Sequence, residues 1–215
     1  MGRRALPKLN PTLDYSDYYD EIGRLPDDWE VSSLFTPDVP LEVELGSGKG
    51  LFITTASGVC PDRNFLGIEI RKKYAQYCAA KVSEAGRNNA FMLQGDGLLF
   101  FRQFLRDSSV DDVHVYFPDP WWKSKHRKRR VLNEPFMQDV IRVLKDDGRF
   151  HFWTDVEEYY HSTLELLRQF PMLEGPLDVE ARPAEHDMDY RTHYERRTRR
   201  YDRPVYRSLY VLRRK

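Results

Sequence analysis

The chain has 215 residues, 34 basic and 34 acidic side chains, no net charge, and a hydrophobic fraction of 40%. This length fits one sizeable domain with a core, and the lack of any run near the roughly 18 apolar residues of a membrane span excludes a membrane protein. The two cysteines exclude a disulfide framework, and the sequence predicts no metal site. The N-terminus lacks the apolar stretch of a signal peptide, so we expect a cytoplasmic protein, either a monomer or a homodimer.

The neutral total hides strong local charge. Residues 14–30 hold seven acidic side chains and one basic side chain, whereas residues 123–130 hold six Lys or Arg and no acid. Residues 191–215 hold ten basic residues against two acidic ones. Two such basic tracts can bind a polyanion even when the whole molecule is neutral.

Residues 1–40 are rich in Pro, Asp and Tyr without a clear period, and we expect an irregular N-terminal arm with one short helix. From residue 41 to residue 215 strands and helices alternate, which predicts one α/β domain with a mostly parallel central sheet and helices on both faces. The expected strands are residues 41–45, 64–70, 90–94, 112–117, 149–153 and 204–212. The expected helices are residues 51–58, 71–85 and 98–105, one capped by Asn133 and one near residue 155.

Three details of this prediction depend on local patterns. In the helix capped by Asn133, the buried stripe ends at Leu144, and residues 145–148 turn the chain into the next strand. Thr154 or Asp155 resembles the first residue of a capping box for the following helix. Residues 171–190 read as a loose, proline-containing segment.

A glycine-rich turn follows the first strand, in the order Glu44-Leu-Gly-Ser-Gly-Lys-Gly50. Such a turn lets the main chain approach a ligand closely. It is not a phosphate-binding P-loop, because Lys49 is followed by glycine, and Leu51 stands where the dinucleotide fingerprint needs its third glycine or alanine. A plain tight turn between strand and helix is the alternative.

Acidic residues follow the next two strands as well. Glu69 can accept two ribose hydroxyls, as acidic residues do in nucleotide sites, or can serve as a carboxylate at a helix N-terminus. Asp96, between two glycines, can accept from an adenine edge or from a turn. Because ligands bind beyond the carboxyl ends of parallel strands, we expect these acids to share one rim.

The fourth such acid is the most distinctive. Asp119 lies between two prolines in Phe117-Pro-Asp-Pro-Trp121, which holds it in a stiff turn, and the basic tract 123–130 follows at once. A rigid loop and a solvated charge run would explain these features separately. Their combination with the glycine turn favours a nucleotide-type cofactor beside a nucleic acid.

Together these motifs resemble the bacterial tRNA (guanine-N7)-methyltransferase family, whose members use S-adenosylmethionine. The resemblance rests on Glu44-x-Gly-x-Gly-x-Gly, Gly-Ile-Glu69-Ile, Gly-Asp96, and Phe-Pro-Asp119-Pro-Trp followed by Lys-x-x-His126-x-Lys-Arg-Arg. It covers roughly residues 40–200 and includes Thr192-His-Tyr-Glu195. It implies a Rossmann-like class I methyltransferase fold with an antiparallel late strand, and methylation of guanine N7 in the variable loop of tRNA.

The resemblance also implies roles for individual residues. Those expected at the S-adenosylmethionine site are Glu44, Glu69, Asp96 and Asp119. Those expected to meet the tRNA are Lys123, Asp155, Thr192, His193, Tyr194 and Glu195. For Asp155 a helix N-cap remains an equal alternative, and His126 is expected to be a solvated member of the tract.

Guanine N7 has an in-plane lone pair and no proton, so the reaction needs alignment more than a base. A carboxylate near the purine edge would stabilise the positive charge that methylation creates, and Asp119 is the expected catalytic residue. Trp121 or Trp122 can supply an aromatic face for the base. The two alternatives are a methyltransferase for another substrate and a non-catalytic RNA-binding module.

Overall fold

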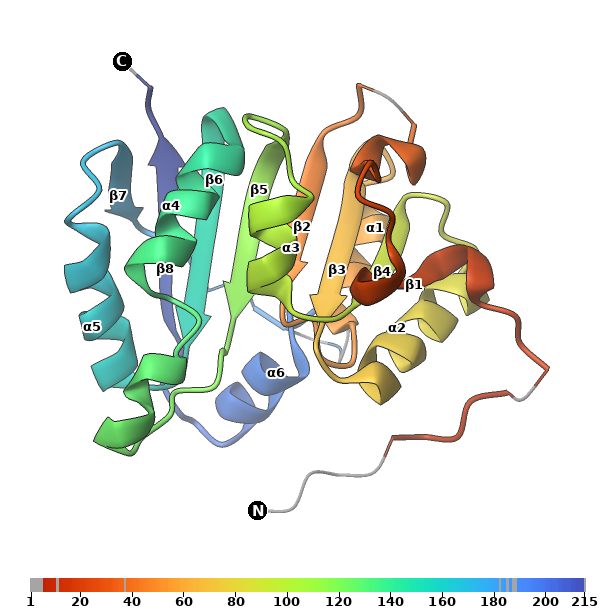
Figure 1. Ribbon diagram of the computed structural model, residues 1–215. Helices are drawn as coiled ribbons and strands as arrows, with labels where there is room; N and C mark the ends of the chain where they lie inside the picture. The colour runs from red at the N-terminus through yellow and green to blue at the C-terminus, as the bar shows by residue number, and fades with distance from the viewer. Residues whose placement is uncertain are drawn as a thin grey trace.

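The computed structural model describes residues 6–10, 12–36, 38–181, 183–184, 186 and 189–214. Its strands form one sheet in the order β1-β4-β3-β2-β5-β6-β8-β7 (Figure 1). The strands are β1 (Tyr19–Glu21), β2 (Leu41–Leu45), β3 (Asn64–Glu69), β4 (Ala90–Gln94), β5 (Val110–Tyr116), β6 (Leu144–Thr154), β7 (Leu173–Leu177) and β8 (Tyr206–Leu212). The α-helices are α1 (Leu51–Val59), α2 (Lys72–Glu84), α3 (Gly97–Gln103), α4 (Glu134–Val143), α5 (Glu157–Leu167) and α6 (His193–Arg200).

The central strands are parallel, as the alternating pattern predicts. Strand β2 pairs with β3 on one side and β5 on the other, and β5 pairs with β6, all in parallel register. Strand β8 runs antiparallel to both β6 and β7, so the predicted late antiparallel strand is confirmed. Because the central strands share one direction, the chain leaves them all at the same edge of the sheet.

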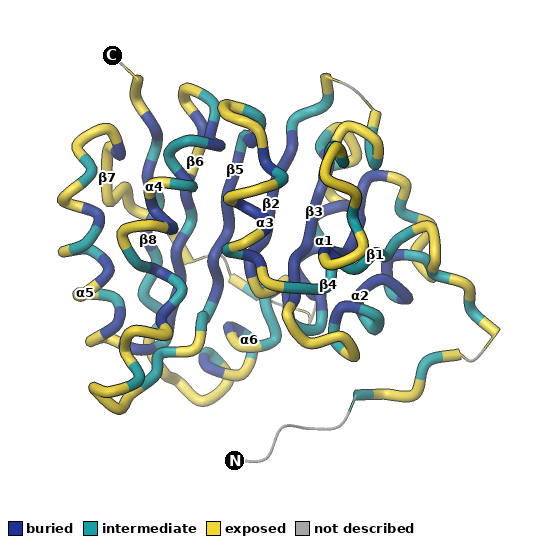
Figure 2. Tube along the Cα trace, viewed as in Figure 1, coloured by how far each residue is buried: buried dark blue, intermediate teal, exposed yellow. Residues whose placement is uncertain are grey.

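One face of the sheet is apolar. Side chains alternate along a strand, so Val43, Val113, Val115, Phe150 and Phe152 all point to this side, where they are fully buried. They pack in one cluster with buried residues of α3, α4 and α5, which lie in front of the sheet in Figure 1. Figure 2 shows the central strands dark blue along most of their length.

The opposite face carries an unusual polar row. Between β2, β5 and β6 it contains Glu42, Glu44, Asp112, His114 and His151, and all but His151 fall in the buried class. Helices α1 and α2 cover the neighbouring apolar part of this face with side chains such as Phe52 and Val82. Buried polar groups persist only when they are hydrogen-bonded or paired, so this row requires an explanation.

The N-terminal segment contributes more regular structure than expected. Residues 19–21 form β1, which pairs in parallel with β4 at the edge of the sheet, and short 3₁₀ helices cover Ser16–Tyr18, Ile22–Arg24 and Val31–Ser33. Ile22 is buried against Gly95, where an added Cβ would approach the Ile22 side chain to 2.9 Å. The strand is therefore held by tertiary packing rather than by a periodic sequence.

Two further details differ from the prediction. Leu144 begins β6 instead of closing the stripe of α4, although it is fully buried, because the adjacent β5 offers a partner for its main chain at Val110. Strand β7 lies within the segment expected to be loose, and β8 provides its hydrogen-bonding partner. The predicted N-cap of α4 is confirmed, since the Asn133 side chain accepts from Phe136 N at 3.1 Å.

Candidate active site

The carboxyl ends of β2, β3, β4, β5 and β6 meet at one edge of the molecule, called here the rim. Main-chain hydrogen bonds join the turns there: Gly46 N donates to Ile68 O at 2.8 Å and Phe117 N to Trp153 O at 2.8 Å. Helix α6 lies beside this rim in Figure 1. The predicted acids Glu44, Glu69, Asp96, Asp119 and Asp155 all belong to these strand ends or to the turns that follow.

The glycine turn after β2 is built for close main-chain approach. Gly46, Gly48 and Gly50 all have positive φ, at 84°, 57° and 73°, a region that side chains disfavour. No atom lies within 4 Å of a Cβ built on Gly46 or Gly48, so both face open space. At Gly50 the same Cβ would collide with Cys78, which explains a glycine there by packing. The turn thus exposes its backbone beside the rim.

Glu69 ties this turn to the end of β3. One of its carboxylate oxygens accepts from Gly48 N at 2.8 Å and the other from Arg71 N at 2.8 Å. Burial raises the pKa of Glu69, the two N–H groups lower it, and the charge of Asp119 raises it. Each oxygen keeps a second lone pair, so the carboxylate can also accept ligand hydroxyls.

Glu44 has a different environment from the other acids. It is buried, and its Oε2 has no hydrogen-bond partner among the described residues. Burial raises the pKa of Glu44 to about 8, while Ser47 and Arg191 act to lower it and Glu69 acts to raise it. A buried acceptor without a partner is costly in an empty site and fits a site that receives a cationic donor.

Two further rim acids, Asp96 and Asp119, are exposed. Asp96 is the N-cap of α3, because its Oδ1 accepts from Leu98 N at 2.9 Å, so the turn alternative holds and the second oxygen remains open to solvent. Asp119 is also exposed. Its negative charge is the smallest of the influences that act on the pKa of Glu69, and it acts to raise that pKa.

The Pro-Asp-Pro turn is strained and anchored. Phe117 and Trp121, at its two ends, have φ values of 50° and 46°, which non-glycine residues seldom adopt. Arg130 holds the turn from below: its Nε donates to Pro120 O at 2.8 Å, and its guanidinium lies 4.4 Å from the centroid of the Tyr159 ring.

The basic tract is therefore divided into internal and external members. Arg130 is buried and forms an ion pair with Glu158 at 2.5 Å, and Arg127 also reaches Glu158, at 3.3 Å. In contrast, Lys123, Lys125, Lys128 and Arg129 are exposed along the 3₁₀ helix Ser124–Arg129 and its N-cap, and they form no ion pair within the described part of the chain, whereas Arg127 is exposed but paired with Glu158. These four can meet a polyanion directly.

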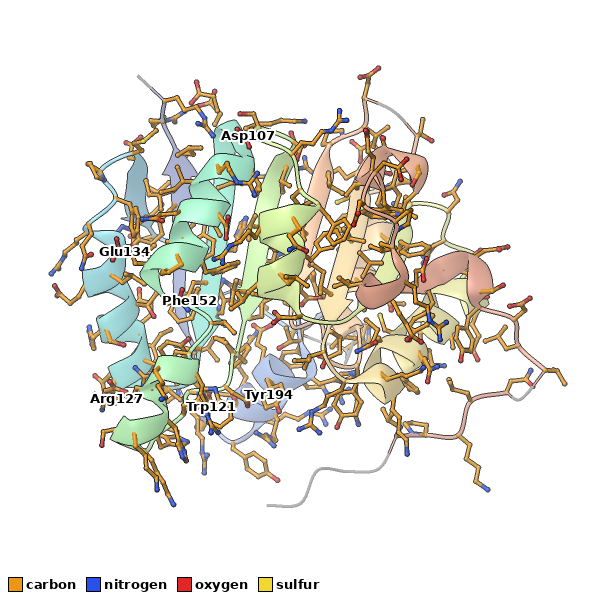
Figure 3. The ribbon with its side chains drawn as sticks, viewed as in Figure 1. Asp107, Trp121, Arg127, Glu134, Phe152 and Tyr194 are labelled. Carbon is orange, nitrogen blue, oxygen red and sulfur yellow. The ribbon has the colours of Figure 1, made fainter. Side chains whose placement is uncertain are left out.

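Exposed aromatic rings lie next to these cations. Trp122 is 67% exposed and Tyr194 is 43% exposed, and the Tyr194 ring stacks on Phe117 with 6.1 Å between centroids. Arg129 lies 5.1 Å from the centroid of Trp121. Figure 3 shows Arg127, Trp121 and Tyr194 along one edge of the molecule, below the strand ends. Aromatic faces among cations suit unstacked bases.

Asp155 does not cap a helix. Helix α5 begins at Glu157 with Val156 as its N-cap and without a side-chain cap, so the predicted capping box is wrong. Instead, Thr154 Oγ1 accepts from Val156 N at 3.2 Å. The Asp155 carboxylate, half-buried at the end of β6, forms no hydrogen bond or ion pair with the part of the chain that the structure describes.

The late segment expected at the substrate site is the start of α6. Thr192 Oγ1 accepts from Glu195 N at 3.0 Å, and a Glu195 oxygen accepts from Arg191 N at 2.7 Å, which together form a variant of the capping box. Glu195 is buried and pairs with Arg207 at 3.0 Å. Thr192 and Glu195 thus shape the helix, whereas Tyr194 is exposed beside Phe117 and His193 is partly exposed.

Comparisons with known proteins agree with this geometry. Residues 38–208 match the family described as a putative methyltransferase. A tRNA (guanine-N(7)-)-methyltransferase of Rhodopirellula baltica is 47% identical over 216 residues, covering 98% of this chain and 80% of that protein. One from Streptococcus pneumoniae is 32% identical over 206 residues, covering 96% and 94%. The chain belongs to the tRNA (guanine-N7)-methyltransferase family.

Solved structures share the fold of this methyltransferase at low sequence identity. The 16S rRNA methyltransferase KamB has a TM-score of 0.61 and 15% identity, covering 85% of this chain and 92% of that one. The antibiotic-resistance methyltransferase Kmr has a TM-score of 0.59 and 12% identity, covering 86% and 92%. The predicted Rossmann-like class I fold is confirmed. Among the described helices of the methyltransferase, none has the length and apolarity needed to cross a bilayer.

The polar row on the sheet contains one group of potential metal ligands, formed by Asp112, His114 and His151. Asp112 accepts from Arg149 at 2.7 Å and from His151 at 2.9 Å, and it pairs with Arg63 at 2.7 Å. Although burial acts to raise it, hydrogen bonds from His151 and Arg149 hold the pKa of Asp112 below its ordinary value. Two guanidinium groups therefore already supply the positive charge that this carboxylate needs in the methyltransferase.

Sequence reasoning missed two residues at the rim of this methyltransferase, Arg191 and Tyr116. The Arg191 side chain reaches back over the sheet and donates to Tyr116 Oη at 3.3 Å. A signal was present, since Thr192-x-x-Glu195 matches a capping box and places Arg191 immediately before a helix. Nothing in the sequence indicated that its side chain would turn inward.

Proposed function

We propose that this chain transfers a methyl group from S-adenosylmethionine to guanine N7 in tRNA. The observation that carries the proposal is the position of Asp119, an exposed carboxylate between two parts of the rim. On one side lie the glycine turn and the buried acids Glu44 and Glu69. On the other side lie the exposed cations and aromatic rings of the tract. A reacting base and a cofactor would meet at this carboxylate.

The residues of the rim fit the cofactor. When bound, S-adenosylmethionine supplies an electrophilic methyl group on a sulfonium centre. The free lone pairs of Glu69 would accept the ribose hydroxyls, and the exposed oxygen of Asp96 would meet the purine edge. The open backbone at Gly46 and Gly48 allows a ligand to approach the turn closely. Glu44, which has a buried oxygen without a partner, would accept from an ammonium group.

The protein's task at guanine N7 is alignment. The nitrogen carries an in-plane lone pair and no proton, so no residue has to remove one. Asp119 would accept from N1–H and the exocyclic amino group of guanine, which holds the base in register. Its negative charge would also offset the positive charge that methylation leaves on the purine, and that interaction grows in the transition state.

The tRNA would be held from both sides of the rim. Lys123 and its exposed neighbours in the tract would contact phosphates, and these contacts set position rather than sequence. Asp155, His193 and Tyr194 would contact the target nucleotide, with Thr192 and Glu195 fixing the helix that carries the last two. Trp122 offers a second ring on which an extruded base can stack.

The deciding experiment is incubation of the purified protein with an unmodified tRNA transcript and methyl-labelled S-adenosylmethionine, followed by nuclease mapping of the labelled base. We expect 7-methylguanosine at a single position, in the variable loop. Label on another base, or only on protein or a small molecule, would show that the protein is a methyltransferase that acts on a different substrate. Tight tRNA binding without any transfer in the presence of cofactor would identify a non-catalytic RNA-binding module.

A further inference from the structure

Arg191 is a cation turned toward the interior of the rim. Its guanidinium lies 5.5 Å from the ring centroids of both Phe52 and Trp153. These rings are only 3% and 5% exposed, so the half-buried Arg191 rests its guanidinium on buried rings of α1 and β6. Arg191 forms no ion pair with a carboxylate in the described part of the chain. A half-buried guanidinium without an acidic partner keeps charge and donors that can bind an anionic ligand.

A chain of hydrogen bonds fixes this guanidinium from behind. Arg191 Nη1 donates to Tyr116 Oη at 3.3 Å, Tyr116 Oη lies 2.8 Å from His114 Nδ1, and His114 Nε2 lies 2.8 Å from Glu42 Oε2. One assignment of protons satisfies every group. Tyr116 donates its proton to Nδ1, and a neutral His114 donates from Nε2 to the Glu42 carboxylate.

The protonation of His114 agrees with that assignment. Burial and then the charge of His151 hold the pKa of His114 well below its ordinary value, so the ring is neutral at neutral pH. A neutral ring has one donor and one acceptor, which are the two roles that the chain requires. Two members of the polar row, His114 and Glu42, are thus linked through Tyr116 to Arg191 at the rim.

The acid Glu44 lies close enough to Arg191 for the two side chains to interact electrostatically. Burial raises the pKa of Glu44, and the positive charge of Arg191 is one of the smaller influences that oppose this rise, yet the two side chains form no ion pair with each other. The rim thus presents a partly buried guanidinium and a buried carboxyl group close together, and the carboxyl has an oxygen without a hydrogen-bond partner among the described residues. A zwitterion with an ammonium and a carboxylate on one carbon, such as an α-amino acid, complements this pair.

Building on the proposed function, we infer that Arg191 binds the carboxylate of the methionine moiety of S-adenosylmethionine, while Glu44 binds its ammonium group. Arg191 is then a cofactor-binding residue. It also connects the cofactor site to helix α6, which carries the residues expected to meet the tRNA, because its main-chain N–H donates to Glu195 in the cap of that helix. Arg203, by contrast, is exposed close to the end of the same helix and has no such environment.

The inference is tested by calorimetry with three probes that differ in the groups Arg191 and Glu44 would recognise. S-adenosylhomocysteine carries both the carboxylate and the ammonium, decarboxylated S-adenosylmethionine carries only the ammonium, and methylthioadenosine carries neither. Arg191→Gln should weaken the binding of S-adenosylhomocysteine by roughly 10- to 100-fold, the effect of losing a charged hydrogen bond. The other two probes should lose less than about 2-fold, because neither has the carboxylate. The matched control Arg203→Gln should leave all three affinities unchanged.

Equal weakening of all three probes would mean that Arg191 only supports the fold, and unchanged affinity for S-adenosylhomocysteine would remove it from the site. A loss of tRNA affinity with intact S-adenosylhomocysteine binding would place it on the RNA. Each result overturns the inference. If Arg191→Gln does not fold, the same three probes are measured with Arg191→Lys and with the wild type. The inference requires that the wild type bind S-adenosylhomocysteine more tightly than methylthioadenosine. A wild-type protein that binds none of the three would contradict the proposed function itself.

Discussion

The guanidinium of Arg130 donates to the main-chain carbonyl of Pro120 at 2.8 Å and so joins the basic tract to the turn that holds Asp119. The same side chain donates to Ser162 Oγ at 3.1 Å and forms the ion pair with Glu158. Arg130 thus lies in the basic tract of the sequence, but in the folded chain it supports the turn at the candidate active site. Members of the tract should consequently differ in what their substitution does.

Substitutions of the buried and the exposed arginines of the tract should differ in their effect on stability. Arg130→Gln removes hydrogen bonds from a buried cation, and we expect the free energy of unfolding to fall by about 1.5–3 kcal/mol. Arg129→Gln changes an exposed side chain, and its effect should stay within about 0.5 kcal/mol. Urea titration followed by circular dichroism measures both values. Equal losses for the two variants would show that Arg130 does not anchor the turn.

The exposed lysines should determine how tRNA binding depends on salt. Replacing Lys123 and Lys125 by Gln leaves fewer phosphates neutralised, so the slope of log affinity against log salt should become shallower by roughly 1 for each lysine that binds a phosphate. Affinity for S-adenosylhomocysteine should be unchanged. Lys145→Gln, at the opposite end of the sheet where Lys145 pairs with Asp111, is the control. A slope that stays at the wild-type value would mean that the tract faces away from the RNA.

Asp119 can be tested for a role in the transition state. Asp119→Asn keeps the size of the side chain but removes its charge, so single-turnover methylation should slow by roughly 100-fold or more while tRNA affinity changes little. Filter binding and rapid quench measure the two quantities on the same preparation. A parallel fall in affinity and rate would instead make Asp119 a residue that positions the base equally in ground and transition states.

The raised pKa of Glu44 predicts that cofactor binding depends on pH. Its pKa of about 8 in the free protein means that the carboxyl is mostly protonated at neutral pH, whereas an ammonium ligand requires the carboxylate. Binding of S-adenosylhomocysteine should then release a proton, and the apparent affinity should rise between about pH 6 and pH 8 and level off above the pKa. Calorimetry in buffers of different ionisation enthalpy measures the proton. Glu44→Gln should abolish the release, and a wild-type protein that releases none would refute the assignment.

Local sequence was sufficient for the order of the elements and for the position of the rim. Alternating patterns, the glycine turn and the paired prolines act through the backbone of a few neighbouring residues, so they predict structure without knowledge of distant partners. The strands of the central sheet, the Asn133 cap and the acids at the strand ends follow from such signals, and the resemblance in these motifs pointed to the correct family.

Contacts between distant segments decided the rest. Strand β1 has three residues and forms because β4 offers an unpaired edge and Ile22 fits against Gly95. Arg130 and Arg191 look like their exposed neighbours in the sequence, and only the folded chain brings Pro120 and Tyr116 to them. A charged side chain is buried when partners from remote strands compensate its lost hydration, and no local pattern records where those partners lie.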